Sequence, residues 1–338
     1  MPVYVVVGGF YGDEGKGKVL SYLALKDDAD LGVRGGVGPN AGHTVVHNGR
    51  EYKLRQIPSA FVNKGALLLI GPGVLVNPEV FLSEVSSTGT EGRIFLDRHC
   101  GIIEPEHIQA DQRSKHLQGK VGTTGTGTGP ANADRALRRL KLAKDIPCLA
   151  KYLEDVPLLV NEAIDSGKNV LIEGTQGTFL SLWHTDHYPY CTSKDTTASA
   201  ICSDVGVGPK KVDEIVVVFK SYVTRVGGGP LEGEYSVEEA KRRGLYEVAT
   251  VTGRVRRAAP FNFKLARRAV MLNSATQIAL TKLDVLFPEV KGATKPDALT
   301  REARDFIERI EEEVGIPVTL ISTGPGSLHM IDLRKEKL

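Results

Sequence analysis

Apolar and polar positions divide the chain into short strand-like runs and amphipathic helical segments. Residues 3–7 (VYVVV) form a continuous, mostly β-branched apolar run that stops at Gly8-Gly9. A run of this kind, without polar alternation, is typical of a strand buried on both faces. Further strands are predicted at residues 66–70, 169–172, 214–219, 277–280 and 317–321.

Helical periodicity occurs between several of these runs. Residues 18–26 carry apolar side chains at the spacing of one helix face, and residues 301–314 show the same pattern more clearly. Gly315 stands where it would end the second helix. The apolar positions are Val19, Leu20, Leu23 and Ala24 in the first segment and Ala303, Phe306, Ile307, Ile310 and Val314 in the second. Strands that alternate with helices predict an α/β fold, with a mostly parallel central sheet flanked by helices.

The chain contains no sign of an internal boundary. A length of 338 residues is enough for roughly two domains. However, no fixed-period repeat and no Pro/Ser-rich linker divides the sequence. We therefore interpret residues 1–338 as a single large domain.

Composition and charge exclude several classes of protein. Hydrophobic residues make up 41% of the chain and charged residues 25%, which is typical of a soluble globular protein and excludes a disordered one. The net charge of +2 gives no reason to expect nucleic-acid binding. No apolar stretch approaches the ~18 residues of a membrane span, and no export signal begins the chain, so we expect a cytoplasmic protein. The four cysteines, without CxxC spacing, are expected to be reduced thiols: Cys100, Cys148, Cys191 and Cys202.

A glycine-rich turn with two carboxylates follows the first predicted strand. Residues 12–18 (GDEGKGK) fit the G-x4-G-K spacing of a P-loop and open a predicted helix, where backbone N–H groups can bind phosphate. Val19 stands where a P-loop needs a hydroxyl for magnesium. Asp13 and Glu14 are unusual in an anion-binding turn, unless one of them binds a cation or accepts a proton. We therefore predict a P-loop-like phosphate site rather than an ordinary glycine turn.

Three further segments combine small residues with polar groups. Residues 35–44 (GGVGPNAGHT) place Asn40 and His43 among glycines, and residues 122–130 (GTTGTGTGP) alternate glycine with threonine. Both compositions suit phosphate oxygens, although a structural histidine and a flexible surface loop remain the alternatives. Residues 173–178 (EGTQGT) follow a predicted strand directly, which is where open α/β sheets bind ligands.

Two charged segments indicate nucleotide binding. Arg254, Arg256 and Arg257 bring three guanidinium groups close together, suited to carboxylate or phosphate oxygens, with a solvated basic face as the alternative. Residues 281–284 (TKLD) resemble the Lys-x-Asp element by which GTP-binding proteins recognise guanine. A carboxylate there accepts the two N–H groups of the guanine edge, which adenine does not offer.

Taken in this order, the segments resemble the adenylosuccinate synthetase family, in a compact form. The matching segments are GDEGKGK (12–18), NAGHT (40–44), GTTG (122–125), EGTQGT (173–178), YPYCTS (188–193), TRVGGGP (224–230), TGR (252–254), TKLDVL (281–286) and STGP (322–325). The resemblance implies an enzyme that joins IMP to L-aspartate with GTP and Mg²⁺, through 6-phosphoryl-IMP, to give adenylosuccinate, GDP and phosphate. It also implies a homodimer.

The resemblance further implies roles for single residues. Asp13 would take the N1 proton of IMP and, with the carbonyl of Gly42, would hold Mg²⁺. His43 would stabilise the transferring phosphoryl group and act as proton donor, and Gln176 would bind the purine near O6. The implied GTP site comprises Gly12, Asp13, Glu14, Gly15, Lys16, Gly17, Lys18, Gly42, His43, Thr44, Arg256, Lys282, Leu283, Asp284, Ser322, Thr323 and Gly324. The implied IMP site comprises Asp13, Lys16, Asn40, Ala41, His43, Thr124, Gln176, Thr192, Arg254 and, from the partner subunit of the dimer, Arg138. The implied aspartate site comprises Thr250, Val251, Thr252, Gly253 and Arg254.

Three positions depart from the family pattern, and two other functions are alternatives. Thr126, Val251 and Val255 stand where many members have Arg, Thr and Arg, which affects phosphate and aspartate contacts rather than the reaction. One alternative function is a GTP-binding switch without ligase activity, which leaves Asp13 and the GTTG segment unexplained. A P-loop kinase is the other, and Val19 argues against it.

Overall fold

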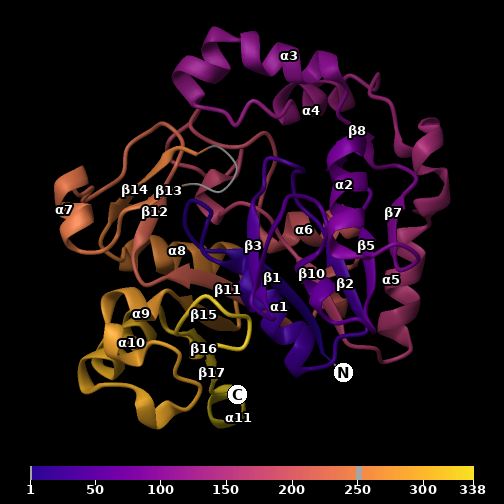
Figure 1. Ribbon diagram of the computed structural model, residues 1–338. Helices are drawn as coiled ribbons and strands as arrows, with labels where there is room; N and C mark the ends of the chain where they lie inside the picture. The colour runs from indigo at the N-terminus through magenta and orange to yellow at the C-terminus, as the bar shows by residue number, and fades with distance from the viewer. Residues whose placement is uncertain (1, 249–252) are drawn as a thin grey trace.

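The computed structural model describes residues 2–248 and 253–338, and its centre is a twisted sheet with helices on both sides (Figure 1). In the described residues this sheet has ten strands in the order β17-β16-β15-β11-β1-β10-β2-β5-β7-β9. All neighbours are parallel except the edge pair β16–β17. The strands are β1 Val3–Gly8, β2 Leu31–Arg34, β5 Leu67–Ile70, β7 Ile94–Asp97, β9 Leu153–Glu154, β10 Val170–Glu173, β11 Glu214–Lys220, β15 Gln277–Thr281, β16 Val318–Ser322 and β17 Met330–Asp332. The predicted α/β class with a mostly parallel sheet is confirmed.

The continuous apolar pattern of β1 reflects burial on two sides. Val5 and Val7 belong to a core that includes helices α5, α6, α8 and α10, whereas Tyr4 and Val6 belong to a second core that includes α1 and α2. Alternate side chains of a strand point to opposite faces, so a strand covered on both faces needs apolar residues at every position. Both cores take residues from both halves of the chain. This supports the interpretation of the chain as a single domain, which stays a prediction.

The two helices that the spacing of apolar residues predicts are present, as α1 and α10. The helix expected at residues 301–314 is α10, which begins after Thr300, whose side chain accepts a hydrogen bond from the Ala303 N–H, and ends at Gly315 with φ of 86°. The helices are α1 Lys16–Lys26, α2 Pro78–Thr88, α3 Pro105–Arg113, α4 Thr128–Ala136, α5 Val156–Asp165, α6 Ala198–Val205, α7 Val237–Arg242, α8 Phe263–Asn273, α9 Leu283–Leu286, α10 Arg301–Val314 and α11 Arg334–Lys337. No helix in the described ranges is long and apolar enough to cross a membrane.

Smaller sheets surround the carboxyl edge of the central sheet. They are the antiparallel β12-β14-β13 sheet, the β3–β4 hairpin and the parallel β6–β8 pair. In Figure 1 the first of these lies with α7 to one side, and α3 and α4 lie across the top. Their strands are β3 His43–His47, β4 Arg50–Leu54, β6 Leu75–Val76, β8 Gly101–Ile102, β12 Val223–Arg225, β13 Glu247–Val248 and β14 Val255–Ala259. The β12-β14-β13 sheet and the β3–β4 hairpin contribute residues to the walls around the strand ends where the candidate site lies.

Candidate active site

A cavity of about 850 Å³ lies over the carboxyl ends of the central strands. The residues that follow β1, β10, β15 and β16, together with the last residue of β11, contribute to its lining. Ligands of open α/β sheets bind at this edge, because the loops after parallel strands converge there. Most of the residues expected from the sequence meet in this cavity.

The lining separates the expected residues into three sets. Those that line the cavity are Gly12, Asp13, Glu14, Gly15, Lys16, Gly17, Lys18, Asn40, Ala41, Gly42, His43, Thr44, Thr124, Gln176, Thr192, Arg254, Arg256, Lys282, Asp284, Ser322 and Gly324. Leu283, Thr323, Gly253 and Arg138 are absent from the described lining. Thr250, Val251 and Thr252 lie outside the described residues.

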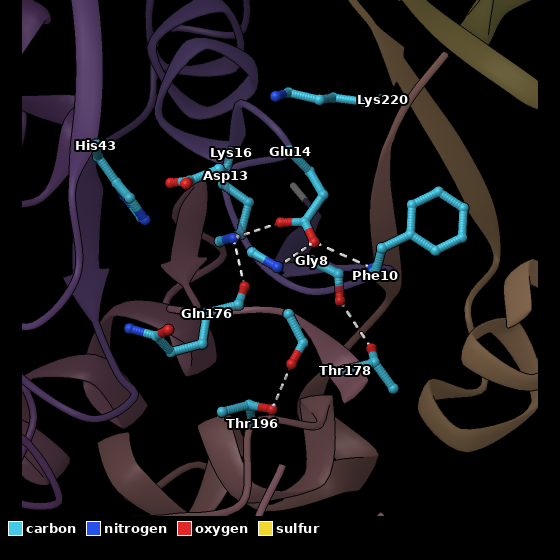
Figure 2. A network of polar contacts seen from close by, with 12 residues as sticks. Gly8, Phe10, Asp13, Glu14, Lys16, His43, Gln176, Thr178, Thr196 and Lys220 are labelled. Atoms are coloured by element: carbon cyan, nitrogen blue, oxygen red, sulfur yellow. Dashed lines mark hydrogen bonds and ion pairs between the residues drawn. The ribbon is translucent and has the colours of Figure 1, made fainter. Parts of the chain in front are cut away.

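The two carboxylates of the glycine-rich turn have different environments (Figure 2). Glu14 is buried, and its carboxylate accepts the N–H groups of Phe10 (3.0 Å) and Gly12 (2.7 Å) and an ion pair from Lys16 (3.0 Å). Glu14 therefore holds the turn together, and its acceptor oxygens are directed to the turn rather than to a ligand. Asp13 has φ of 62°, a left-handed conformation that costs a non-glycine residue energy. This strained backbone directs the carboxylate of Asp13 out of the turn.

The turn packs tightly against the segment after β10. A Cβ atom on Gly177 would lie 2.3 Å from the backbone nitrogen of Gly12, so no larger residue fits there. The Lys16 ammonium donates to the carbonyl of Gln176 across the same contact. Glycine at position 177 thus allows two backbones to approach closely. In Figure 2 the backbone carbonyl of Gln176 meets the Lys16 ammonium, while the side-chain amide of Gln176 points away from this contact.

Asp13 is bound to an arginine in the structure. Nε of Arg256 donates to Oδ2 of Asp13 at 2.9 Å, while Nη1 of Arg256 donates to Glu247 at 2.6 Å. Glu247 also accepts from Lys220 at 2.9 Å and from the hydroxyl of Tyr222. Burial lowers the pKa of Lys220, whereas the surrounding cations, against the effect of burial, hold the pKa of Glu247 far below its usual range. Arg256 thus supplies the positive charge that neutralises the carboxylate of Asp13 in this structure.

His43 is held through one ring nitrogen. Its Nδ1 contacts the carboxylate of Glu173 and lies 2.8 Å from Nη1 of Arg34, and Arg34 itself donates to Glu173. Ser59 donates to Glu173 through both its N–H (2.6 Å) and its hydroxyl (2.9 Å). The carboxylate of Glu173 only accepts and favours a proton on Nδ1, whereas the guanidinium of Arg34 only donates and favours a lone pair there. Both contacts use Nδ1, so Nε2 is the ring nitrogen that remains for the cavity.

Burial sets the charge state of this cluster. Burial, followed by the nearby Arg34 guanidinium, lowers the pKa of His43 to about 4, so the ring is neutral near pH 7. Burial alone would favour the protonated form of Glu173, but Arg34 and His43 lower the pKa of this carboxyl to about 2. An ionised Glu173 therefore fixes the orientation of a neutral His43.

Opposite ends of the cavity differ in composition. One end has Lys282 and Asp284, which follow β15, Ser322, which is the last residue of β16, and Gly324, which comes two positions later. Thr323, assigned to GTP from the sequence, is instead buried and donates to the carbonyl of Ala293 at 2.6 Å. Leu283 likewise is buried in the core, because it begins helix α9 on its inner side.

The other end collects amides, hydroxyls and a guanidinium. Asn40 Nδ2 donates to the hydroxyl of Thr192 at 3.3 Å, and the hydroxyls of Thr124 and Thr126 lie 2.9 Å apart. The buried Oδ1 of Asn40 has no hydrogen-bond partner in the described structure. Arg254 donates to the carbonyl of Gly122 at 2.9 Å, which joins the TGR segment to the glycine–threonine loop. This end suits a polar, oxygen-rich group.

Comparison with known proteins decides the family. The family model for adenylosuccinate synthetase matches residues 5–147 and 140–295, which is most of the chain. The chain belongs to the adenylosuccinate synthetase family. It is 57% identical to the adenylosuccinate synthetase of Archaeoglobus fulgidus over 338 residues, with all of both chains covered. It is 55% identical to that of Methanocaldococcus jannaschii, covering 98% of this chain and 97% of the relative.

Solved structures agree with this family. A fully ligated adenylosuccinate synthetase from Plasmodium falciparum superposes with a TM-score of 0.89 at 26% identity, covering 98% of this chain and all of that one. A succinoaminodeoxyadenylate synthetase from cyanophage S-2L has a TM-score of 0.82 at 23% identity, covering 98% and 95% of the two chains, and so shares the fold. The resemblance inferred from the motifs is confirmed at the level of the family.

The oxygen atoms of Asp13 and Gly42 at the cavity suit a magnesium ion. No group of three or more His, Cys, Asp or Glu side chains that could hold a metal occurs in the part of the chain that the structure describes. Mg²⁺ at a nucleotide commonly uses one or two protein oxygens together with phosphates and water. The Asp13 carboxylate and the Gly42 carbonyl, both at the cavity, fit this sparse set of hard oxygen donors, and Arg256 already pairs with Asp13 as a cation would.

Sequence reasoning assigned no role to Arg34, Lys220 or Glu173, although it placed Glu173 at the start of a segment expected at the ligand edge, and a signal for all three exists. Arg34, Glu173 and Lys220 are each the last residue of an apolar strand, and each is buried. A charged residue that closes an apolar strand lies at the ligand edge of the sheet, so this position alone marks it as a candidate. Glu247 has no such signal, because its role arises from the packing of β13 against β14. Arg257, grouped with the cavity arginines from the sequence, instead pairs with Glu234 at 2.8 Å.

Proposed function

We propose that this cavity ligates L-aspartate to IMP at the expense of GTP, through 6-phosphoryl-IMP, and releases adenylosuccinate, GDP and phosphate. Membership of the family makes the chain a ligase that forms adenylosuccinate. The observation that carries the proposal is the meeting of Asp13, Lys16, His43 and Gln176 between a Lys-x-Asp end and an oxygen-binding end of one cavity.

The chemistry begins with the carbonyl oxygen of the purine, which is a poor leaving group. Asp13 takes the proton from N1 of IMP, so that O6 becomes nucleophilic and attacks the γ-phosphate of GTP. Gln176, which lines the same cavity, binds the purine near O6 and orients it. The amine of aspartate then displaces phosphate from C6, and adenylosuccinate forms.

Charge neutralisation supports the phosphoryl transfer. Lys16 and the N-terminus of α1, whose N-cap Gly15 has no side-chain cap, offer positive charge and free N–H groups to phosphate. Mg²⁺, held by Asp13 and Gly42, would neutralise charge on the phosphates when bound. His43 meets the transferring group through Nε2, and nearby phosphate oxygens raise the pKa of a histidine, so bound GTP favours the form that donates a proton.

The two ends of the cavity then bind the remaining parts of the substrates. We assign the guanine base to Lys282, Asp284, Ser322 and Gly324, and GTP phosphate contacts to Arg256, which would have to leave Asp13. The IMP phosphate is assigned to Asn40, Thr124 and Thr192, with the neighbouring Ala41. Residues 250–254 are assigned to aspartate, for which Arg254 supplies a guanidinium.

A three-substrate assay tests the function. IMP, aspartate, GTP and Mg²⁺ are mixed with the protein, and the purine absorbance is followed with and without aspartate. An aspartate-dependent change in the spectrum is expected. GTP hydrolysis without such a change would favour the GTP-binding switch instead, and release of phosphorylated IMP would favour a kinase.

Guanine recognition by Asp284 gives a second test. Replacing Asp284 by asparagine removes one of the two carboxylate acceptors and puts an amide N–H donor against an N–H donor of guanine, so the KM for GTP should rise by about 10²-fold or more. The KM for IMP should stay within about twofold, because the base of GTP is bound elsewhere in the cavity. Glu289→Gln, outside the described lining of the cavity, is the control. Equal rises for both substrates would remove Asp284 from guanine recognition.

A homodimer in which Arg138 serves the partner's site is part of the proposal. Arg138 is exposed and absent from the described lining of its own cavity, with φ of 61° at the end of α4. Light scattering should give twice the mass of one chain. Arg138→Ala should raise the KM for IMP about 10-fold and leave the KM for GTP unchanged, as expected when one charged contact to a phosphate is lost. A monomer with full activity would contradict both expectations. We expect a cytoplasmic enzyme, because its charged substrates do not cross membranes unaided.

A further inference from the structure

The lysine at the P-loop position of the glycine-rich turn is directed away from the phosphate site. Nζ of Lys18 donates to three backbone carbonyls, those of Gly324, Gly326 (2.7 Å) and His329 (2.9 Å). All three belong to the segment between β16 and β17, more than 300 positions along the chain. Lys18 is 8% exposed. Its neighbour in the turn, Lys16, is the one that reaches Gln176 and Glu14.

Counting donors shows what Lys18 can do. A lysine ammonium has three N–H groups and no acceptor, and here each one has a carbonyl partner. Contact with a GTP phosphate would require breaking one of these bonds inside a buried site. Burial lowers the pKa of Lys18 to about 7, whereas three carbonyl acceptors favour the charged form that donates to all of them. The side chain is therefore fully occupied by one segment of backbone.

That segment carries part of the wall assigned to guanine. Ser322, Gly324 and Pro325 line the cavity, as do Lys282 and Asp284. Lys18 lies near this end, because Gly324, whose carbonyl accepts from Lys18, is part of the cavity lining.

The same segment is also pinned to α1 and β3 by a serine. Ser21 donates to the hydroxyl of Ser327 at 2.9 Å, and the N–H of Ser327 donates to the carbonyl of Val46 at 2.8 Å. The turn is tight, since a Cβ atom on Gly324 would lie 2.8 Å from Nδ1 of His329. Lys18 is the charged member of this set of contacts. Without Lys18, the carbonyl of Gly324 loses its ammonium donor, whereas the carbonyls of Gly326 and His329 keep the N–H groups of His329 (3.0 Å) and Thr323 (3.1 Å). The segment then loses its charged hydrogen bonds to α1, and with them part of what holds the wall in position.

We propose that Lys18 is a positioning residue for guanine recognition: it holds residues 322–329 in place as one wall of the base site and does not bind phosphate. This inference rests on the proposed function, because that function assigns the base of GTP to this end. It links the turn that binds phosphates to the wall that selects the base, through α1. Loss of Lys18 should therefore weaken binding of the base and spare binding of the phosphates.

Binding of the two halves of the nucleotide tests this directly. Dissociation constants of guanosine, inorganic tripolyphosphate, GTP and IMP are measured by calorimetry for the wild type, Lys18→Met and Lys18→Arg. We expect Lys18→Met to raise the dissociation constants of guanosine and GTP by a similar factor of about 10 or more, because charge-assisted hydrogen bonds that position the base site are lost. The dissociation constants of tripolyphosphate and IMP should change less than about twofold, because neither ligand is assigned to the wall that Lys18 holds. Lys18→Arg should recover part of the affinity, because a guanidinium also donates to carbonyls.

Controls separate this result from general damage and from failure of the proposed function. Lys26→Met removes an exposed lysine of the same helix and should change none of the four constants. Ser327→Ala perturbs the same segment but leaves Lys18 in place, so it should raise the dissociation constant of guanosine by a smaller factor than Lys18→Met. This variant keeps the proposal testable if Lys18→Met does not fold. If Lys18→Met bound tripolyphosphate more weakly but guanosine with unchanged affinity, the proposal would be overturned. Unchanged affinity for both ligands would overturn it as well. A wild type that binds GTP but never forms adenylosuccinate would refute the proposed function. The dissociation constants of guanosine and tripolyphosphate would still decide whether Lys18 positions the base site.

Discussion

Replacing Asp13 by asparagine should lower kcat of the ligation by about 10²–10⁴-fold, the usual contribution of a positioned general base. Asparagine keeps the shape of the side chain but does not accept the N1 proton of IMP. The same change weakens the oxygen set proposed for Mg²⁺, so the dependence of the rate on Mg²⁺ should shift to higher concentration. The measurement is kcat at saturating IMP, GTP and aspartate over a range of Mg²⁺.

The fold should survive this substitution. Asp13 has φ of 62°, and asparagine adopts the left-handed conformation at least as readily as aspartate. The side chains of its ion pair with Arg256 are mostly buried, but Arg256 keeps a second ion pair, with Glu247 at 2.6 Å, so the substitution leaves no unpaired buried charge. Asp28→Asn is the matched control, because Asp28 has φ of 47°, lies on the surface and is absent from the described lining of the cavity. Near-normal turnover of the Asp13 variant would refute its role as the base.

Replacing His43 by asparagine should lower kcat by about 10²–10³-fold, the cost of removing one positioned donor to a developing charge. The KM for IMP should change far less than kcat, because Nε2 of His43 is assigned to the transferring phosphoryl group rather than to ground-state binding. Steady-state kinetics with each substrate varied in turn measures both quantities.

A histidine of the same strand gives the control for this experiment. His47 lies at the other end of β3 and is absent from the described lining, so His47→Asn should leave kcat unchanged. The melting temperature of both variants must be compared with the wild type, since His43 is buried against Glu173 and Arg34. A rise in the KM for IMP with unchanged kcat would contradict the assignment of His43 to phosphoryl transfer.

Residues at the ends of strands show how far prediction from the sequence reached. The runs that became β1, β10, β11, β15 and β16 could be recognised, because burial on both faces leaves a local apolar signature. The glycine-rich segments after them could be assigned to the ligand edge, since parallel strands end at one side of a sheet. The end of β10 shows the limit: the strand was expected at residues 169–172 and includes Glu173, which orients His43.

The sequence by itself determined the fold class, the family and the segments that meet at the cavity, because these follow from local periodicity and from motifs that keep their order. Tertiary structure alone decided which polar side chains face the cavity and which hold its walls. Glu14 turns inward, Lys18 spans to the segment before β17, and Asp13 meets Arg256, which is 243 positions away. Such contacts depend on where distant backbone groups come to lie once the strands are assembled. A charged residue in a motif therefore has no fixed partner until the fold supplies one.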